Sequence, residues 1–203
     1  AGNDTFQVGQ VFKSLREAAL AGVAADDEFA TIETTRGFLS NGVSFQTTFD
    51  GQDGNDSFVI FRNKGSITLL GGAGDDSFTV RAFAAESSRT SISGQAGRDF
   101  VQYVANADVS IDGGDGNDTL KLIGTEFSDV FEVTWDAIYG AGRTLTYENV
   151  EQITIDGGEG NDEFYILSTP ADGSISLYGG LGSDTFIISS RISVDTGLPV
   201  QVD

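Results

Sequence analysis

One short stretch decides the fold of this chain, and its first fully regular copy is Gly71-Gly72-Ala73-Gly74-Asp75-Asp76-Ser77-Phe78. Numbered from its first glycine, the stretch has glycine at positions one, two and four, aspartate at position six and an apolar residue at position eight. Looser copies carry glutamine at position two, and the first copy is truncated. The seven copies span residues 1–6, 51–58, 71–78, 94–101, 113–120, 157–164 and 179–186. A stretch that recurs in this way indicates a repeat architecture.

The spacing of the position-six aspartates predicts the length of one coil. Successive aspartates from Asp56 to Asp118, and from Asp162 to Asp184, are 19 to 23 residues apart. We interpret the 44 residues between Asp118 and Asp162 as two periods with one motif skipped. Positions eight and ten are apolar in every copy, and this alternation predicts strands with one buried face. The sequence therefore predicts an all-β fold, a parallel β-solenoid of the β-roll or β-helix type with about 20–23 residues per coil.

Two segments depart from this rhythm. Residues about 14–22 start at Ser14, a candidate N-cap, and continue with helix-forming residues, so we predict one short helical insertion. Residues about 129–152 contain turn glycines but no aspartate motif, so we predict an irregular coil there. No linker composition divides the chain. We expect residues 1–203 to form a single domain that is a fragment of a longer repeat protein.

The composition excludes several classes of function. The chain has 31 acidic and 11 basic residues, a net charge of −20, which argues against nucleic acid or an anionic membrane as a partner. An apolar share of 39% with 15 phenylalanines still allows a real core. The absence of Cys and His excludes zinc–thiolate sites, histidine metal centres and the usual catalytic triads. No apolar run is long enough to span a membrane, so we expect no membrane insertion. We expect no enzymatic activity.

The recurring stretch resembles the consensus of the repeats-in-toxin family, Gly-Gly-x-Gly-x-Asp-x-U-x, in which U is large and apolar. The resemblance implies a parallel β-roll whose turns bind several calcium ions between successive coils, through aspartate carboxylates and backbone carbonyls. Calcium takes six to eight oxygen ligands, and glycine allows a backbone conformation that turns carbonyls inward. The ligands that the resemblance implies are Asp56, Gly71, Asp76, Gly94, Asp99, Gly113, Asp118, Gly157, Asp162, Gly179 and Asp184.

Further aspartates extend this ligand set. Asp50, Asp112 and Asp156 directly precede the first glycine of their motifs and are candidates for additional carboxylates. Asp4 belongs to the truncated copy, and we expect it to complete a site only in a longer protein. Arg98 argues against full occupancy of the turn that contains it.

The chain departs from the family pattern in the spacing of its motifs. Tandem nonapeptides of the family would place a motif every nine residues and bind ions along both edges of the roll. Here the motif occurs once per coil, so we predict ions along one edge only. The expected neighbours on that edge are Asp56 and Asp76, Asp76 and Asp99, Asp99 and Asp118, and Asp162 and Asp184.

Other interpretations of the same residues are weaker. Gly, Asn and Asp dominate ordinary tight turns, but seven copies in phase with buried strands favour an ion site. An EF-hand needs an acidic or amide side chain at the third loop position, where this chain has Gly114. Trp135 and Tyr139 are candidates for a sugar-stacking patch, although local packing is the commoner role. The acidic pairs Asp26/Asp27 and Asp75/Asp76 suit solvated or ion-bound turns better than glycosidase chemistry.

These observations favour a calcium-binding structural or scaffold module of a large secreted or cell-surface bacterial protein, of the adhesin or extracellular matrix type. The resemblance implies export through a type I channel and folding on calcium binding outside the cell. The alternatives are an accessory module of a secreted protease, lipase or polysaccharide-modifying enzyme, and a polysaccharide-binding adhesion module. The expected partners are calcium ions and adjacent repeats, with extracellular polysaccharide or a cell surface as further candidates.

Overall fold

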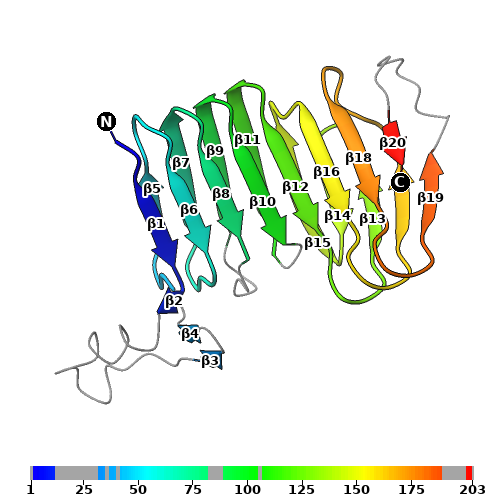
Figure 1. Cartoon of the computed structure of the whole chain (residues 1–203), viewed down its shortest axis with the longest axis horizontal. Coiled ribbons are helices and arrows are strands. Elements are labelled where there is room, and N and C mark those ends of the chain that lie inside the picture. Colours follow the sequence, from blue (N-terminus) through cyan, green and yellow to red (C-terminus); the bar gives the residue numbers. More distant parts are fainter. Residues whose placement is uncertain are drawn as a thin grey trace.

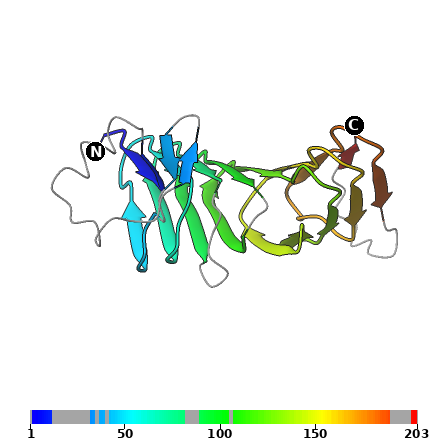
Figure 2. The same cartoon turned by 90° about the horizontal axis from the view of Figure 1, so that it is seen from below.

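Two stacked sheets make up most of the structure, a computed structural model that describes residues 2–11, 32–34, 37–39, 42–81, 89–104, 107–188 and 200–202. Within these ranges the chain forms strands and no helix, so the all-β prediction is confirmed. The two sheets face each other along the whole length of the molecule (Figures 1 and 2). The helix predicted at about 14–22 lies outside the described residues. No helix in the described part of the chain is long and apolar enough to cross a membrane.

The first sheet has eight strands, all parallel to their neighbours. In spatial order they are β1 (Thr5–Val8), β6 (Ser57–Ile60), β8 (Ser77–Val80), β10 (Phe100–Val104), β12 (Thr119–Ile123), β16 (Gln152–Asp156), β18 (Ser174–Tyr178) and β20 (Val200–Val202).

The second sheet has nine strands and is parallel except around β14. In spatial order they are β5 (Thr47–Asp50), β7 (Ile67–Ala73), β9 (Thr90–Gly97), β11 (Val109–Gly116), β15 (Arg143–Glu148), β14 (Ala137–Gly140), β13 (Val130–Val133), β17 (Glu163–Ile166) and β19 (Thr185–Ile188). A small antiparallel sheet of β2 (Gln10–Val11), β4 (Gly37–Leu39) and β3 (Ile32–Thr34) lies beside the N-terminal end (Figure 1).

Successive coils stack in register, where a coil is one passage of the chain through a strand of each sheet. Phe58 pairs with Phe78, Phe78 with Val101, and Val101 with Leu120, so position eight of each motif lies above position eight of the next. The strands β6 and β8 alternate between buried and partly buried residues, as the period-two pattern predicts. This register brings equivalent turn residues of neighbouring coils together.

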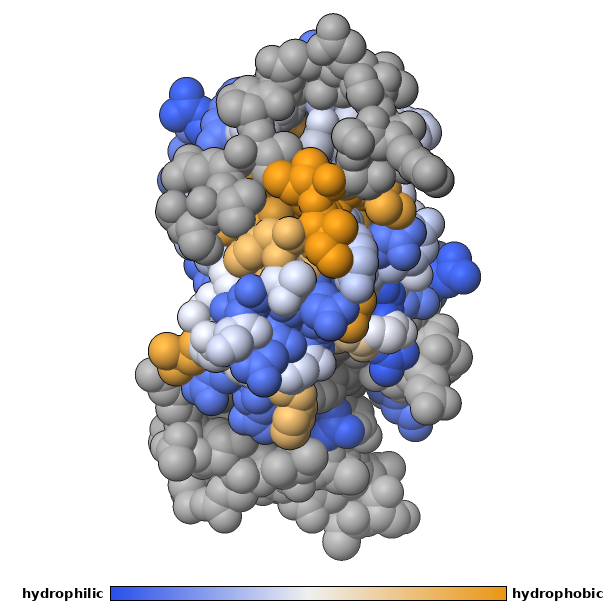
Figure 3. Space-filling model, turned by 90° about the vertical axis from the view of Figure 1, so that its right-hand side faces the viewer, coloured by the Kyte–Doolittle hydropathy of each residue, from blue (hydrophilic) through white to orange (hydrophobic). Residues whose placement is uncertain are grey.

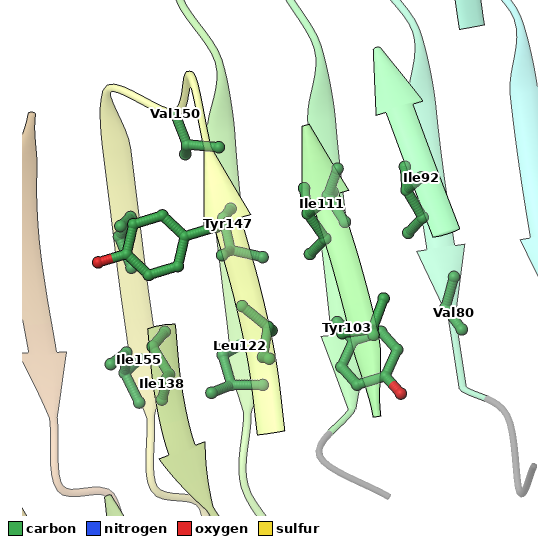
Figure 4. Close-up of a cluster of buried hydrophobic side chains, with 14 of the residues drawn as sticks. Val80, Ile92, Tyr103, Ile111, Leu122, Ile138, Tyr147, Val150 and Ile155 are labelled. Atoms are coloured by element: carbon green, nitrogen blue, oxygen red, sulfur yellow. The ribbon is translucent and has the colours of Figure 1, made fainter. Parts of the chain in front are cut away.

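The core lies between the sheets and contains two stacks of phenylalanine rings. Phe58 and Phe78 are completely buried, and their ring centroids are 4.8 Å apart. Phe131 and Phe164 form the equivalent contact in the second sheet, with centroids 5.2 Å apart. Figure 4 shows aliphatic and tyrosine side chains from both sheets filling the space between them. Burial of such side chains, about 1.5–3 kcal/mol each, is the main source of stability.

Residues 129–152, predicted to form an irregular coil, contain an antiparallel meander of β13, β14 and β15 that fills the second sheet between β17 and β11. Ala141 and Gly142 have φ values of 48° and 69° and make a two-residue hairpin loop, which requires positive φ at both positions. Gly140 lies under the ring of Phe131, and a Cβ there would be 2.6 Å from the ring atom Cε1. The glycines of this segment therefore serve a hairpin, and the predicted skipped motif is wrong.

The motif changes from one kind of turn to the other between Asp118 and Asp129, just before the meander. Up to Asp118, each turn of the motif leads from the second sheet into the first, as from β7 to β8. From Asp129 onward, the turns of the motif lead from the first sheet into the second, as from β16 to β17. Because all strands of the first sheet run in the same direction, the two groups of turns lie at opposite edges, the upper and the lower edge in Figure 1. The prediction of turns along a single edge is therefore wrong.

The C-terminal end of the second sheet is less well covered than its middle. Strand β19 is the last strand in this sheet, its Phe186 is only partly buried, and Ile187 and Ile188 are 42% and 56% exposed. Figure 3 looks onto this end of the molecule and shows apolar side chains gathered at its middle. Apolar core positions of the last coil lack a next coil among the described residues.

Candidate functional site

The glycines of the motif keep space open inside each turn. In the turn at residues 71–76, Gly72 and Gly74 have φ values of 113° and 135°, which side-chain-bearing residues rarely adopt. Gly71 is required for a different reason. A Cβ at Gly71 would lie 2.6 Å from the carbonyl oxygen of Gly94 in the next coil, and it would collide with Oδ2 of Asp76. A carbonyl oxygen and a carboxylate oxygen therefore face the same small space.

The position-six aspartates form a hydrogen-bonded ladder from coil to coil. The backbone N–H of Asp56 donates to Oδ1 of Asp76 at 2.7 Å, and that of Asp76 donates to Oδ1 of Asp99 at 2.8 Å. The same bond links Asp99 to Asp118 at 2.7 Å. Asp4 begins this first ladder, because its N–H donates to Oδ1 of Asp56 at 2.6 Å. The side chain of Asp4 is exposed, and its completion of an ion site in a longer protein stays a prediction.

A second ladder runs along the opposite edge. The N–H of Asp129 donates to Oδ1 of Asp162 at 2.8 Å, and the N–H of Asp162 donates to Oδ1 of Asp184 at 2.9 Å. All four predicted neighbour pairs are thus in contact, but they are divided between two edges.

The other carboxylate oxygen has no protein partner in most of these residues. Within the described ranges, Oδ2 is buried and accepts no hydrogen bond in five ladder aspartates: Asp56, Asp76, Asp99, Asp118 and Asp162. These residues are at most 2% exposed. A buried carboxylate oxygen without a partner is strongly unfavourable, and a bound cation would compensate for it.

Burial also perturbs the acidity of these groups. Loss of solvation raises the pKa of the Asp99 carboxyl to about 6, and repulsion by Asp118 and Asp76 adds to this effect. Burial likewise raises the pKa of Asp76, Asp118 and Asp162 above the ordinary value of 3.8. Without a counter-ion these carboxylates hold protons more tightly than usual. This chemistry fits a cation as the missing partner.

The remaining ligands at each step would be backbone carbonyls. The carbonyl oxygens of Gly71, Gly94 and Gly113 face the first glycine and the aspartate of the preceding coil, and Gly157 and Gly179 do the same on the second ladder. In the described part of the chain no three acidic side chains come together as a metal cluster. One carboxylate per coil combined with carbonyls suits calcium, which accepts both kinds of oxygen in flexible geometry.

Three of the sequence-predicted carboxylates lie outside this arrangement. Oδ1 of the exposed Asp50 accepts the N–H of Gln52 at 3.1 Å. Oδ1 of Asp112 accepts from the side-chain amide of Asn149 at 2.8 Å. Asp156 forms an ion pair with Lys121 at 3.6 Å. Each of these aspartates directly precedes the position-one glycine, which is buried. Because neighbouring residues of a strand face opposite sides of the sheet, the aspartate side chains lie on the outer face.

The sequence analysis missed an eighth turn, Gly124-Thr125-Glu126-Phe127-Ser128-Asp129-Val130-Phe131. It keeps glycine at position one, aspartate at position six and apolar residues at positions eight and ten, which is the signal that could have identified it. In this turn Oδ2 of Asp129 accepts the N–H of Thr125 at 2.7 Å and its hydroxyl at 3.0 Å. The protein itself therefore satisfies Oδ2 of Asp129.

Side chains at position five form an outer ladder beside the first one. The N–H of Asp75 donates to Oδ1 of Asn55 at 3.1 Å, and the N–H of Arg98 donates to Oδ1 of Asp75 at 2.9 Å. Arg98 is exposed and has no side-chain acceptor, so it cannot extend this outer ladder. Its effect on ion occupancy stays a prediction. Asp75 points outward and Asp76 inward, so these two carboxyls do not face a common site.

Trp135 and Tyr139 do not form a joint patch. Trp135 is 65% exposed and lines a hollow together with Pro170 and Asp172. Tyr139 lines a different hollow beside Arg143. The two rings therefore lie in separate surface environments.

Comparison with known proteins gives one match. A family model described as the RTX calcium-binding nonapeptide repeat, in four copies, matches residues 106–121 and 154–165. These ranges contain the turns of Asp118 and Asp162, one from each ladder. Neither a curated protein nor a solved structure matches the chain.

Proposed function

Because the chain carries RTX calcium-binding nonapeptide repeats on both edges of its two-sheet fold, we propose that it is a β-solenoid whose coils are held together by calcium at the aspartate turns. The observation that carries this proposal is the row of buried aspartates with one carboxylate oxygen lacking a partner. In this function the module is structural and not catalytic.

The two carboxylate oxygens of a ladder aspartate have different roles at each step. Oδ1 of the aspartate accepts the N–H of the preceding coil and sets the distance between coils. Oδ2 and the position-one carbonyl of the next coil would hold the ion. Bound calcium supplies positive charge that offsets repulsion in a chain of net charge −20. Since equivalent turns meet only in the stacked state, binding free energy adds directly to folding free energy.

We place this module in a secreted or cell-surface bacterial protein, as a scaffold of the adhesin or matrix type. RTX repeats are typical of secreted bacterial proteins. Sites built from one carboxylate and several carbonyls suit an environment rich in calcium, since extracellular calcium modules bind with dissociation constants of about 10⁻⁴–10⁻³ M. In such a setting the chain would fold after export, where the ion is abundant.

Removal of calcium tests this function directly. Circular dichroism in excess chelator should show loss of β structure or a large fall in melting temperature, and added calcium should restore both. Magnesium is the control, because it demands octahedral geometry and keeps its water, so it should restore little. An unchanged melting temperature in chelator would contradict the proposal.

A further inference from the structure

Each regular step of the first ladder shows the same three relations between neighbouring coils. At the step from Asp99 to Asp118, the N–H of Asp99 donates to a carboxylate oxygen of the next coil, and Oδ2 of Asp99 is buried without a partner. The carbonyl of Gly113 faces the space beside Gly94 and Asp99. These three relations define where an ion would be held.

The first ladder ends at Asp118, because the next strand of the first sheet is not preceded by a motif. The residues that follow Asp118 in space are Asn149–Glu151, the short connection between β15 and β16. The sequence offers no reason to expect a site there. By motif alone, Asp118 would be the last aspartate of a row with nothing beyond it.

The structure nevertheless repeats all three relations at this end. The N–H of Asp118 donates to Oε2 of Glu151 at 2.7 Å. Oδ2 of Asp118 is buried and has no hydrogen-bond partner, and the residue is 2% exposed. A Cβ at Gly113 would be 2.7 Å from this Oδ2 and would collide with the carbonyl oxygen of Asn149. Glu151 thus takes the place of the next aspartate, and Asn149 that of the next glycine.

The connection is held firmly in this position. Asn149 has a φ of 52°, a left-handed conformation that asparagine tolerates, and its side-chain amide donates to Asp112. Val150 is buried and belongs to the core cluster drawn in Figure 4. The N–H groups of Glu151 and Gln152 both donate to the carbonyl of Asp118, at 3.2 and 2.9 Å. The contacts of Asn149 itself and of the residues that follow it therefore fix the position of the Asn149 carbonyl.

We propose that Asp118, Asn149 and Glu151 form a further calcium site that closes the first ladder, with a motif-free turn in place of the missing aspartate repeat. This inference rests on the proposed function, because it assumes that calcium occupies the regular steps. The second ladder supplies the contrast. At Asp129 the same oxygen is satisfied by Thr125, so that step has no orphaned oxygen to recruit an ion.

A nearby tryptophan provides a site-specific readout. A surface hollow of about 370 Å³ beside this connection is lined by Trp135, Tyr147, Glu148, Asn149, Glu151 and Asp172, among others. Trp135 is the only tryptophan of the chain. Terbium, a trivalent ion that replaces calcium in oxygen sites, emits when an adjacent indole is excited. Terbium at this site should therefore emit under indole excitation, and Trp135→Phe should abolish that signal.

The variant Glu151→Gln tests the site. Glutamine keeps an oxygen that can accept the N–H of Asp118 but removes the charge, so the fold should persist in calcium. Calorimetric titration should show one calcium ion fewer per molecule than in the parent, and indole-excited terbium emission should fall at least several-fold. The matched control is Glu148→Gln, which changes an exposed carboxylate at the end of β15, next to the connection, and should leave both readings unchanged.

The outcomes separate this inference from the function on which it rests. If Glu151→Gln binds as many calcium ions as the parent with equal terbium emission, the closing site is wrong, while chelation still tests the ladders. If Glu148→Gln loses the ion and Glu151→Gln does not, the assignment of Glu151 is also wrong. If the proposed function itself is wrong, chelator will leave the melting temperature of the parent protein unchanged.

Discussion

Asp76 and Asp129 occupy equivalent places in the two ladders, but the hydrogen bonding of their second carboxylate oxygen, Oδ2, differs. Both aspartates donate a backbone N–H to the carboxylate of the next coil. Oδ2 of Asp76 is left without a partner, whereas Oδ2 of Asp129 accepts two hydrogen bonds from Thr125. The turn at Asp76 therefore leaves one carboxylate oxygen that a cation would satisfy, and the turn at Asp129 leaves no such Oδ2.

Position two of the motif accounts for this difference. Thr125 lies outside the positive-φ region, and its N–H and hydroxyl both point to the carboxylate. Gln52 and Gln95 also replace the glycine, but they keep positive φ values of 69° and 75°. Their aspartates, Asp56 and Asp99, still have an unpartnered Oδ2. Loss of the position-two glycine alone therefore does not give Oδ2 of the aspartate a partner. In this chain Oδ2 gains one where the residue at position two also leaves the positive-φ region and carries a hydroxyl donor.

The largest expected effect tests what the two regions share, which is the aromatic core. Phe78→Ala and Phe131→Ala each remove a fully buried ring, and each should cost about 3–5 kcal/mol of unfolding free energy. Chemical denaturation in saturating calcium measures both. Phe45→Ala is the control, because Phe45 is 84% exposed and should change stability by less than about 0.5 kcal/mol. Similar losses for Phe45 and Phe78 would show that the ring stacks are not the core.

A smaller effect separates the two turns. Asp76→Ala should lower calcium stoichiometry in calorimetric titration and cost about 1–3 kcal/mol through lost hydrogen bonds, with a larger loss at limiting calcium. Asp129→Ala should cost a similar amount through its bonds to Thr125, but equally with and without calcium, and with unchanged stoichiometry.

The control for these two variants is Asp172→Ala. Asp172 is exposed in the loop between β17 and β18, at the edge opposite to the turns of Asp162 and Asp184. It should be neutral in both readings. Loss of an ion from Asp129→Ala, or none from Asp76→Ala, would reverse the comparison.

The smallest effect concerns pH in the absence of calcium. The pKa of Asp99 is raised from 3.8 to about 6 in the folded state, chiefly by burial, so the folded protein holds this proton over a range where the unfolded chain has lost it. Stability of calcium-free protein should therefore fall as pH rises from about 4 through about 6. Thermal melts in chelator across this range measure the slope.

Asp99→Asn provides the comparison for this titration. The variant has no carboxyl to titrate at that position, so its melting temperature in chelator should depend less on pH than that of the parent. In the parent, calcium affinity should weaken below about pH 6, because protons compete for the same oxygen. Identical pH profiles for the two proteins would exclude Asp99 as a source of the slope.

Local chemistry made much of this fold predictable. The alternation around Phe58 and Phe78 predicted inward-facing positions, and the structure confirms that both rings are buried. The spacing of Asp76 and Asp99 predicted neighbours, and a hydrogen bond joins them. Both predictions succeed because a strand repeats every two residues and a stacked coil repeats at nearly constant length.

The change of edge was not predictable by the same reasoning. The 44 residues between Asp118 and Asp162 equal two periods, which concealed a half-coil step to Asp129 followed by the meander. The turn at Asp129 lacks glycine at positions two and four, so it did not match the repeat. The turn glycines of this segment indicate a hairpin, but the antiparallel pairing of β14 also depends on contacts with two other strands.

The sequence by itself determined the six-residue turns, the buried faces and the glycine and aspartate chemistry of the turns, since each of these follows from residues that lie close together in the chain. Tertiary structure alone decided which edge a turn occupies and what meets its carboxylate there. The edge that a turn occupies follows from strand direction, which depends on how many times the chain has passed between the sheets. The second depends on residues from another coil, such as Glu151, 33 positions after Asp118, which carries no motif and acquires its place only when the coils stack.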